Sequence, residues 1–339
     1  MGGGDRYVYH LARALQPLCE VTFFSFGPRY RQGDIAGLRH IVLPVRFSAN
    51  QDDPLPGSLA YADRRFDIVH MHHLWSKATM LATLVRSASR RPVVVTDHGG
   101  GGGRLIRRSG FYRLVSAFVC QSDFARGLLP AAARRHATVI KGGLDPDRFP
   151  YTPAPRSRQV LQLGRIMPHK GINYLIEAAG SDIAVVVAGK VVNDGYYREL
   201  QQQAEGQPVR FLIDADDDAI RGELGRSAVT VAASVYRDVH GGTWPTSELL
   251  GLTLLESMSV GTPVICTDVG GMPEFVRNGV TGFIVPPNDS MALRRRLLQV
   301  LDDPAGAARM GAAGHDHVKQ YSWNVVAKKL LTEYTRLLH

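Results

Sequence analysis

The chain has 339 residues, of which 45% are hydrophobic and 21% charged, with 35 glycines and 19 prolines. This is the composition of a globular protein of about two domains, and it excludes a long disordered chain. No apolar run reaches the ~18 residues of a membrane span, and no signal-peptide pattern opens the chain. Three cysteines are too few for a disulfide scaffold and lack metal-ligand spacing, so a reducing cytoplasm is the expected compartment.

Positive charge is concentrated in the first half of the chain. Residues 1–150 carry 21 Lys and Arg against 11 Asp and Glu, whereas the remainder carries 19 against 20. Such asymmetry points to an anionic partner for the first half. The alternative is a surface kept soluble by arginine, which the lack of a dense basic run favours. Nucleic acid is not expected, because basic residues are not interleaved with aromatic ones.

The first half alternates between predicted helices and strands, which is typical of a doubly wound parallel sheet. Ser122 is placed to cap a helix over Phe124–Leu129. The remaining predicted elements are a helix at Tyr7–Leu15, a helix at Ser76–Ser87, and strands at Glu20–Phe26, Asp67–Met71, Pro92–Thr96 and Phe118–Cys120.

The opening of the chain departs from this pattern. A doubly wound domain should begin with a strand, yet Met-Gly-Gly-Gly leads at once into a helix. These glycines resemble the loop that follows a first strand. We therefore expect the first strand of this domain to be missing, either because the start is truncated or because the sheet lacks it.

A proline-rich stretch, Asp145–Arg158, contains four prolines and no apolar periodicity, which indicates a linker. After it the alternation resumes. The predicted strands are Val160–Leu163, Ile183–Ala188, Val209–Ile213, Val229–Ala232, Val264–Thr267 and Phe283–Val285. The predicted helices are Ile172–Ala179, Tyr196–Glu205, Asp217–Arg226, Thr253–Val260, Ser290–Leu301 and Trp323–Leu338. The sequence thus predicts an α/β fold of two similar domains, residues 1–150 and 151–321, facing across a cleft, with a terminal helix over residues 322–339 that returns toward the first domain.

The richest constellation of polar residues lies at Ser247–Gly271. Glu248 and Glu256 are eight residues apart, and Gly251 precedes a helix that begins near Thr253. A helix start beside a glycine turn offers unpaired N–H groups to a phosphate. Glu248 would precede that anion site and Glu256 would lie about one turn inside the helix. The alternative is that both are solvent-facing glutamates.

A second constellation, LGRIMPHKG at Leu163–Gly171, follows the first strand of the second domain. Arg165 and Lys170 would stand at the carboxyl end of that strand. A guanidinium binds phosphate oxygens as a fork and an ammonium acts as a point charge, so the pair could neutralise a diphosphate. Two exposed basic residues in a loop are the alternative.

Together these motifs resemble the family-four retaining glycosyltransferases, which have the two-domain GT-B fold of Rossmann-like domains. The resemblance is carried in the second half by GRxxxxKG (Gly164–Gly171), Glu-x7-Glu and GTPVICTDVGGMPE (Gly261–Glu274). In the first half it is carried by GGGDRYVYHLARAL (Gly2–Leu15), VVTDHG (Val94–Gly99) and GGLDPDRF (Gly142–Phe149), and at the end by YSW (Tyr321–Trp323). It covers essentially the whole chain except the first strand.

The resemblance implies a hexosyltransferase that moves a sugar from a nucleoside-diphosphate sugar to a hydroxyl acceptor with retention, without metal or other cofactor. Glu248 would hold hydroxyls of the donor sugar, Glu256 the ribose hydroxyls, and His98 would contact the donor sugar. Donor phosphates would be bound by the remaining residues, namely Gly2, Gly3, Gly164, Arg165, Lys170, Gly251 and the backbone amides of Leu252, Thr253 and Leu254.

The mechanism expected from this resemblance is electrostatic. Fixed cations and helix amides would stabilise the departing diphosphate, and that phosphate would assist the acceptor hydroxyl, so no protein nucleophile is predicted. The basic first domain would attract an acidic acceptor, such as a lipid phosphate at the inner membrane surface, through Arg104, Arg107 and Arg108. The alternatives are a non-catalytic nucleotide-sugar-binding protein and another GT-B enzyme, such as an epimerase or a phosphorylase.

Three further patterns have simpler interpretations. The acidic run Asp214–Asp218 is expected to cap a helix rather than to hold a metal. His70, His72 and His73 are expected to line the cleft or pack in the core, although His72 or His73 could touch the acceptor. The glycine run Gly99–Gly103 is not expected to be a nucleotide loop, because no helix with suitable spacing is predicted after it.

Overall fold

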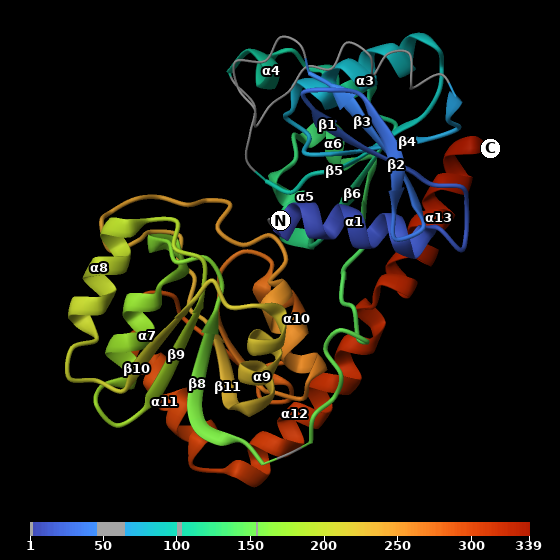
Figure 1. Ribbon diagram of the computed structural model, residues 1–339. Helices are drawn as coiled ribbons and strands as arrows, with labels where there is room; N and C mark the ends of the chain where they lie inside the picture. The colour runs from blue at the N-terminus through green and yellow to red at the C-terminus, as the bar shows by residue number, and fades with distance from the viewer. Residues whose placement is uncertain (1–2, 46–64, 100–103, 154) are drawn as a thin grey trace. The chain divides into compact units, whose positions relative to one another are not determined.

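The computed structural model describes the chain except for residues 1–2, 46–64, 100–103 and 154 (Figure 1). It contains two compact units, which are described separately. Unit 1 comprises Met1–Gly143 and Trp323–His339, and unit 2 comprises Leu144–Ser322. No helix in the described residues has the length and apolar character needed to cross a membrane.

Unit 1 contains two sheets among its described residues, whereas a single parallel sheet was expected. In the first sheet β1 (Thr22–Gly27) pairs in parallel with β3 (Leu38–Pro44), and β2 (Arg31–Ile35) pairs antiparallel with β3. The hairpin between β2 and β3 turns through Ala36 and Gly37, both at positive φ. Positive φ at both central residues is the geometry of a tight hairpin turn, and alanine is an unusual residue there. For this reason no hairpin was predicted here.

The second sheet of unit 1 is wholly parallel, in the order β4-β5-β6-β7. Its strands are β4 (Val69–His72), β5 (Val93–Thr96), β6 (Ala117–Cys120) and β7 (Ala137–Val139). The first three were predicted, and β7 was not. Because all four run the same way, the residues that follow β4, β5 and β6 gather at one edge of the sheet.

The helices of unit 1 begin with α1 (Gly3–Leu15) and end with α13 (Trp323–Leu338), which pack against each other. Ser122 caps α5 (Asp123–Leu128) through a bond from the N–H of Ala125, as predicted. The others are α3 (Lys77–Ala88), α4 (Arg104–Arg108), the 3-10 helix η2 (Phe111–Leu114) and α6 (Ala131–Arg134). The short helix α4 follows the glycine run directly, where no helix was predicted.

Unit 2 is built on one six-stranded parallel sheet in the order β10-β9-β8-β11-β12-β13. The strands are β8 (Ser157–Leu163), β9 (Ala184–Gly189), β10 (Val209–Ile213), β11 (Ser227–Ala232), β12 (Val264–Thr267) and β13 (Gly282–Val285). All six were predicted within a few residues. The strand order reverses between β8 and β11, so the loops after these two strands flank the usual ligand position of a doubly wound sheet.

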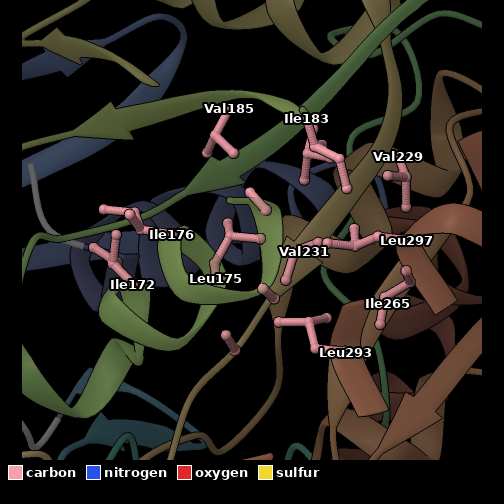
Figure 2. Packing of buried hydrophobic residues seen from close by; sticks show 14 of the residues in the cluster. Ile172, Leu175, Ile176, Ile183, Val185, Val229, Val231, Ile265, Leu293 and Leu297 are labelled. Atoms are coloured by element: carbon pink, nitrogen blue, oxygen red, sulfur yellow. The ribbon is translucent and has the colours of Figure 1, made fainter. Parts of the chain in front are cut away.

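Helices cover both faces of this sheet. Figure 2 shows one face, where Val229, Val231 and Ile265 of the strands meet Leu175 and Ile176 of α7 and Leu293 and Leu297 of α11. The helices of unit 2 are α7 (Ile172–Ala179), α8 (Asp194–Gln203), α9 (Asp217–Arg226), α10 (Leu252–Ser259), α11 (Ser290–Leu301) and α12 (Pro304–Val318), with 3-10 helices η3 (Pro168–Lys170), η4 (Met272–Phe275) and η5 (Lys319–Tyr321). This sheet with helices on both faces is a Rossmann-like domain.

The boundary between the units lies at Gly143, not at residue 150 as predicted. Leu144 forms a parallel bridge with Ser322, and the carbonyl of Phe149 accepts a 2.7 Å bond from Ser259 Oγ of α10. These contacts attach the start of the proline-rich stretch to unit 2. Its last residues, from Ser157, already belong to β8.

Candidate functional site

The loop after β8 brings two cations to the carboxyl edge of the unit 2 sheet. Arg165 is exposed, and the structure gives it no ion pair among the described residues. Lys170 ends η3 and is followed by Gly171 at φ +63°, where an added Cβ would lie 2.0 Å from the carbonyl oxygen of Ala233. Only glycine fits so close to the end of β11. The glycine of the motif therefore holds the lysine loop against the neighbouring strand.

Glu248 meets this lysine from a loop that precedes α10. Its Oε1 accepts a hydrogen bond from Lys170 Nζ and a second, of 2.6 Å, from Ser234 Oγ. Burial alone would raise the pKa of Glu248, but the ammonium of Lys170 and the hydroxyl of Ser234 outweigh it and hold the pKa below its ordinary value. Lys170 and Glu248 thus form a charged pair with side chains only 16% and 14% exposed.

The double glycine of the TDVGG segment fixes the backbone of Glu248. The N–H of Gly271 donates to the Glu248 carbonyl at 2.9 Å. Gly270 has φ +62°, and an added Cβ there would lie 1.9 Å from the same oxygen. The carboxylate is therefore positioned by two segments that are distant in sequence, one of which is a motif that the resemblance identified but assigned no role.

The start of α10 lies next to this pair in the chain. Gly251, at φ +83°, is the N-cap and offers no side chain to the helix amides. The Leu254 N–H, which was expected to bind phosphate, donates to the Gly251 carbonyl at 3.0 Å. Glu256 lies one turn inside the helix, as predicted, and Glu248 precedes it. The N-terminal amides and the cations of the β8 loop together suit an anion.

His169, between Pro168 and Lys170, is a residue of this site that the sequence reasoning did not single out. Its ring lies 4.6 Å from the indole of Trp244, whose Nε1 donates to Asp238 at 2.6 Å. Nδ1 of His169 is buried without a hydrogen bond to any described residue. Burial and the neighbouring Lys170 lower the pKa of His169 to about 4, so the ring adds no charge beside the lysine. The position of His169 inside the GRxxxxKG motif is the sequence feature that could have pointed to it.

In unit 1, the predicted residue His98 belongs to a buried network at the carboxyl edge of β4, β5 and β6. Its Nδ1 is 3.1 Å from Gln121 Nε2 and its Nε2 is 3.0 Å from His72 Nδ1. His70 is bonded through Nδ1 to the Tyr334 hydroxyl of α13 at 2.6 Å and through Nε2 to Thr96 Oγ1 at 2.8 Å. His70 and His72 are thus packed, as one of the two predicted alternatives had it, whereas His73 is exposed.

Burial keeps these histidines neutral. Desolvation lowers the pKa of His70 to about 3 and that of His98 to about 3, and it lowers the pKa of His72 further below its ordinary value together with the neighbouring histidines. The unit 1 edge therefore presents neutral hydrogen-bonding groups, in contrast to the ion pair of unit 2.

The arginines after the glycine run lie close to this edge. The Arg107 guanidinium stands 5.2 Å from the centre of the Trp75 ring, and its charge acts on Asp97, the residue before His98. Burial nevertheless raises the pKa of Asp97. Arg108 is exposed, and Leu105 on the same helix is 85% exposed. Helix α4 therefore presents basic and apolar groups to solvent beside the histidine network.

The acidic run of unit 2 has the predicted capping role. Asp216 caps α9 by accepting the N–H of Ala219 at 2.8 Å, and Asp217 pairs with Arg148 at 2.6 Å. Within the described ranges, no three His, Cys, Asp or Glu residues are arranged to hold a metal ion.

Gly3 begins α1, whereas Gly2 lies outside the described residues.

Comparison with known sequences places both halves of the chain. Residues 145–317 match the family described as Glycosyl transferases group 1, and residues 1–148 match Glycosyltransferase Family 4. The phosphatidyl-myo-inositol mannosyltransferase of Mycobacterium tuberculosis is 30% identical over 332 residues, covering 88% of this chain and 83% of that protein. The D-inositol 3-phosphate glycosyltransferase of Streptomyces avermitilis is 29% identical over 365 residues, covering 95% and 76%.

Solved structures share the fold over nearly the whole chain. A glycosyltransferase from Rickettsia africae has a TM-score of 0.78 at 19% identity, covering 99% of this chain and 95% of that one. HepE of Anabaena in complex with UDP has a TM-score of 0.76 at 18% identity, covering 98% and 96%. These likenesses show the GT-B fold of two Rossmann-like domains.

The neutral histidines make the stability of unit 1 depend on pH. Their folded pKa values lie below the ~6.5 of an unfolded histidine, so their contribution is present above pH 6.5 and is lost as pH falls. Between pH 6.5 and pH 5 the loss should be roughly 1–2 kcal/mol for each of His70 and His98. Hydrogen exchange of the β4, β5 and β6 amides, corrected for intrinsic rates, measures it. His136→Asn, at an exposed site, should leave the dependence unchanged, and equal opening free energies at pH 7.5 and pH 5 would contradict the prediction.

Proposed function

The chain is a glycosyltransferase of the Glycosyl transferases group 1 family, and we propose that it moves a sugar from a nucleoside-diphosphate sugar to a phosphate-bearing hydroxyl acceptor, with retention and without a metal ion. The observation that carries the donor half of this proposal is the arrangement of Arg165, Lys170 and Glu248 beside the start of α10. Its cations are held at the carboxyl edge of a Rossmann sheet, where ligands of this fold class bind.

Within this proposal, Arg165 and Lys170 bind the diphosphate. Arg165 has no ion pair among the described residues and can turn its fork onto phosphate oxygens. Lys170 is paired with Glu248, so a diphosphate must share or displace that carboxylate. Both cations and the α10 amides would then face the negative charge that develops as the anomeric bond breaks, and each such preorganised donor is worth about 3 kcal/mol.

The proposal includes retention and metal independence. The bond to the departing diphosphate breaks as the acceptor oxygen bonds to the anomeric carbon on the same face, and the acceptor proton passes to a phosphate oxygen. Fixed protein cations do the neutralisation that a bound metal would otherwise supply. No side chain is assigned the role of nucleophile.

The two glutamates have separate roles in this proposal. Glu256, inside α10, holds the ribose hydroxyls. Glu248, which Lys170 and Ser234 keep ionised, accepts from hydroxyls of the sugar. Gly164 and Gly251 let the backbone approach the phosphates.

The acceptor side of the proposal rests on charge and on the names of relatives. The relatives named above act, by those names, on phosphatidyl-myo-inositol and on D-inositol 3-phosphate. Both are polyols that carry phosphate. The surplus of basic residues before residue 150 and the arginines of α4 supply the complementary charge. A lipid-borne phosphate would draw the chain to a membrane surface, and a free phosphate would not.

The donor clamp is tested by removing its cations. Arg165→Ala should weaken binding of UDP or GDP by roughly tenfold or more. Arg165 is exposed and has no ion pair among the described residues, so this substitution removes only the contact with phosphate. Lys170→Met should weaken it further, since it also leaves Glu248 buried without its cation. Isothermal titration calorimetry measures both. Arg198→Ala, which removes an exposed charge from α8, is the matched control.

The double variant Lys170→Met/Glu248→Gln separates the two effects of the lysine, because it removes the cation without stranding a carboxylate. Unchanged affinity for both nucleotides in Arg165→Ala and in this double variant would refute the clamp.

Turnover in EDTA should equal turnover in its absence. Loss of turnover in EDTA, restored by Mg²⁺ or Mn²⁺, would refute metal independence alone.

The division between the glutamates predicts different ligand dependence. Glu256→Gln should weaken binding of the free nucleoside diphosphate and of the nucleotide sugar by the same factor, about tenfold, because it loses only ribose contacts. Glu248→Gln should affect the nucleotide sugar more than the free nucleotide. Paired titrations with UDP and UDP-glucose, or GDP and GDP-mannose, measure this. Equal effects of Glu248→Gln on the free and sugar-bearing nucleotide would refute the division.

The acceptor charge is tested by reversing the arginines of α4. Changing Arg104, Arg107 and Arg108 to Glu should raise the acceptor KM at least tenfold and leave donor affinity unchanged, because repulsion acts only on the anionic acceptor. Salt raised from 20 mM to about 0.1 M should imitate the loss in the wild type, since the Debye length then falls to ~10 Å.

The matched control reverses three exposed arginines elsewhere in unit 1, Arg13, Arg31 and Arg39, which changes the net charge equally. An equal rise in KM in both triple variants would show a general charge effect and no acceptor site at α4. Anionic vesicles and soluble D-inositol 3-phosphate, assayed separately, distinguish a lipid-borne from a free acceptor.

A further inference from the structure

The connection from the end of β11 to the start of α10 is long for a link between a strand and a helix. When they are ordered, connections of more than about 12–15 residues in a compact domain are usually functional. Part of this one folds back on itself. Arg237 and Thr243 form an antiparallel bridge, and the N–H of Trp244 donates to the Tyr236 carbonyl at 2.8 Å. We call residues 236–244 the β11–α10 hairpin.

Asp238 holds this hairpin together. Its side chain is buried, and its carboxylate accepts the N–H of His240 at 3.0 Å, the N–H of Gly242 at 2.8 Å and the indole N–H of Trp244 at 2.6 Å. Burial alone would raise the pKa of Asp238, but these hydrogen bonds outweigh it and hold the pKa below its ordinary value. The ionised carboxylate therefore fixes the Trp244 side chain through a charge-assisted hydrogen bond.

One arm of the hairpin reaches the lysine of the charge pair. The Trp244 ring packs against the ring of His169, with 4.6 Å between the ring centres. The N–H of Val235, next to the hairpin, donates to the His169 carbonyl at 2.9 Å. His169 is buried and directly precedes Lys170 in η3. Because the ring and the backbone of His169 are both held, the backbone that carries Lys170 is held as well.

The other arm reaches the glutamate. The Tyr236 hydroxyl accepts the N–H of Gly270 at 2.7 Å. Gly270 lies so close to the Glu248 carbonyl that an added Cβ would be 1.9 Å from its oxygen. The next residue, Gly271, donates its N–H to that carbonyl at 2.9 Å. Tyr236 therefore fixes the segment against which the backbone of Glu248 rests.

The outer side of the hairpin is attached to two further elements of unit 2. Asn288 Nδ2, between β13 and α11, donates to the Arg237 carbonyl at 3.0 Å. His240 Nε2 lies 2.7 Å from Glu199 Oε2 of α8. The hairpin is thus joined to the segments that follow β8, β12 and β13 and to α8. Because it cannot move without breaking some of these contacts, it is suited to hold its neighbours in place.

From these contacts we infer that the β11–α10 hairpin positions both partners of the charge pair. Trp244 positions Lys170 through the histidine ring that it covers, and Tyr236 positions the backbone of Glu248 through the double glycine. Asp238 acts on both because it holds the hairpin closed. All three are positioning residues, and none is assigned a contact with substrate. The inference rests on the proposed function for what the pair binds, which is the diphosphate at the lysine and the sugar at the glutamate.

The reactivity of Lys170 tests the positioning without any substrate. This lysine is ion-paired and little exposed, so it should be acetylated slowly. Trp244→Ala should raise its rate at least about threefold, because the loop opens more often. Mass spectrometry after timed acetylation measures the rate, with exposed Lys328 as internal reference. Trp244→Phe keeps a ring against His169 and should restore the slow rate. Val239→Ala, at an exposed site of the same hairpin, is the matched control. An unchanged rate in Trp244→Ala overturns the inference.

Affinity for the donor separates the two arms. Trp244→Ala should weaken binding of UDP and of UDP-glucose by the same factor, about tenfold, because the diphosphate is common to both ligands. Tyr236→Phe removes the acceptor of the Gly270 N–H. It should weaken UDP-glucose about fivefold and UDP less, because Glu248 holds only the sugar. GDP and GDP-mannose are the second pair of probes. Equal losses of the free and the sugar-bearing nucleotide in Tyr236→Phe overturn the role of this arm.

A double-mutant cycle distinguishes positioning from a general loss of structure. In the Lys170→Met/Glu248→Gln background, Trp244→Ala should weaken UDP binding no further, because the residue that it positions is gone. A further loss as large as that in the wild-type background would overturn the inference. Normal UDP affinity of Lys170→Met/Glu248→Gln itself, with faster acetylation of Lys170 in Trp244→Ala, would refute the donor clamp of the proposed function and leave the positioning role standing.

Discussion

The carboxyl edge of the unit 2 sheet depends on one charge pair with little exposure to solvent, Lys170 with Glu248. Lys170 comes from the loop after β8, Glu248 from the loop before α10, and Ser234, which follows β11, completes the contact. A carboxylate so little exposed is tolerable only with its cation and hydrogen bonds in place. The close approaches at Gly171 and Gly270 keep them in place. The pair therefore couples the positions of three loops.

The corresponding edge of the unit 1 sheet carries neutral side chains instead of an ion pair. Its edge residues are histidines whose burial removes their charge, joined through Gln121 and Tyr334 into a hydrogen-bonded network. A charge here would interact over a long range but with little directional preference. A neutral N–H held by stacked rings binds one oxygen in one direction. The terminal helix α13 takes part in this network through the Tyr334 hydroxyl, which contacts His70 Nδ1.

Local sequence signals predicted the helices and strands of unit 2 closely. They could not predict contacts between residues that are distant in the sequence. Helices α7, α9 and α11 begin and end where caps and apolar spacing placed them. The helix α12 was missed because its alanines and glycines give little apolar periodicity. The Ala36–Gly37 turn was missed because alanine rarely signals a hairpin. The motifs predicted that Lys170 and Glu248 belong to one site, but not that they bind each other, since the two are 78 residues apart.

The contrast between the two edges matches the chemistry of sugar transfer. Breaking a bond to a diphosphate creates negative charge on the leaving group, which cations stabilise. In the function proposed above, Arg165 and Lys170 in the loop after β8 supply these cations. Hydroxyl groups gain no charge when they bind, and their selection depends on the direction of single hydrogen bonds. A buried hydroxyl left unpaired costs more than its hydrogen bond contributes, so a neutral donor held in one direction selects for that hydroxyl.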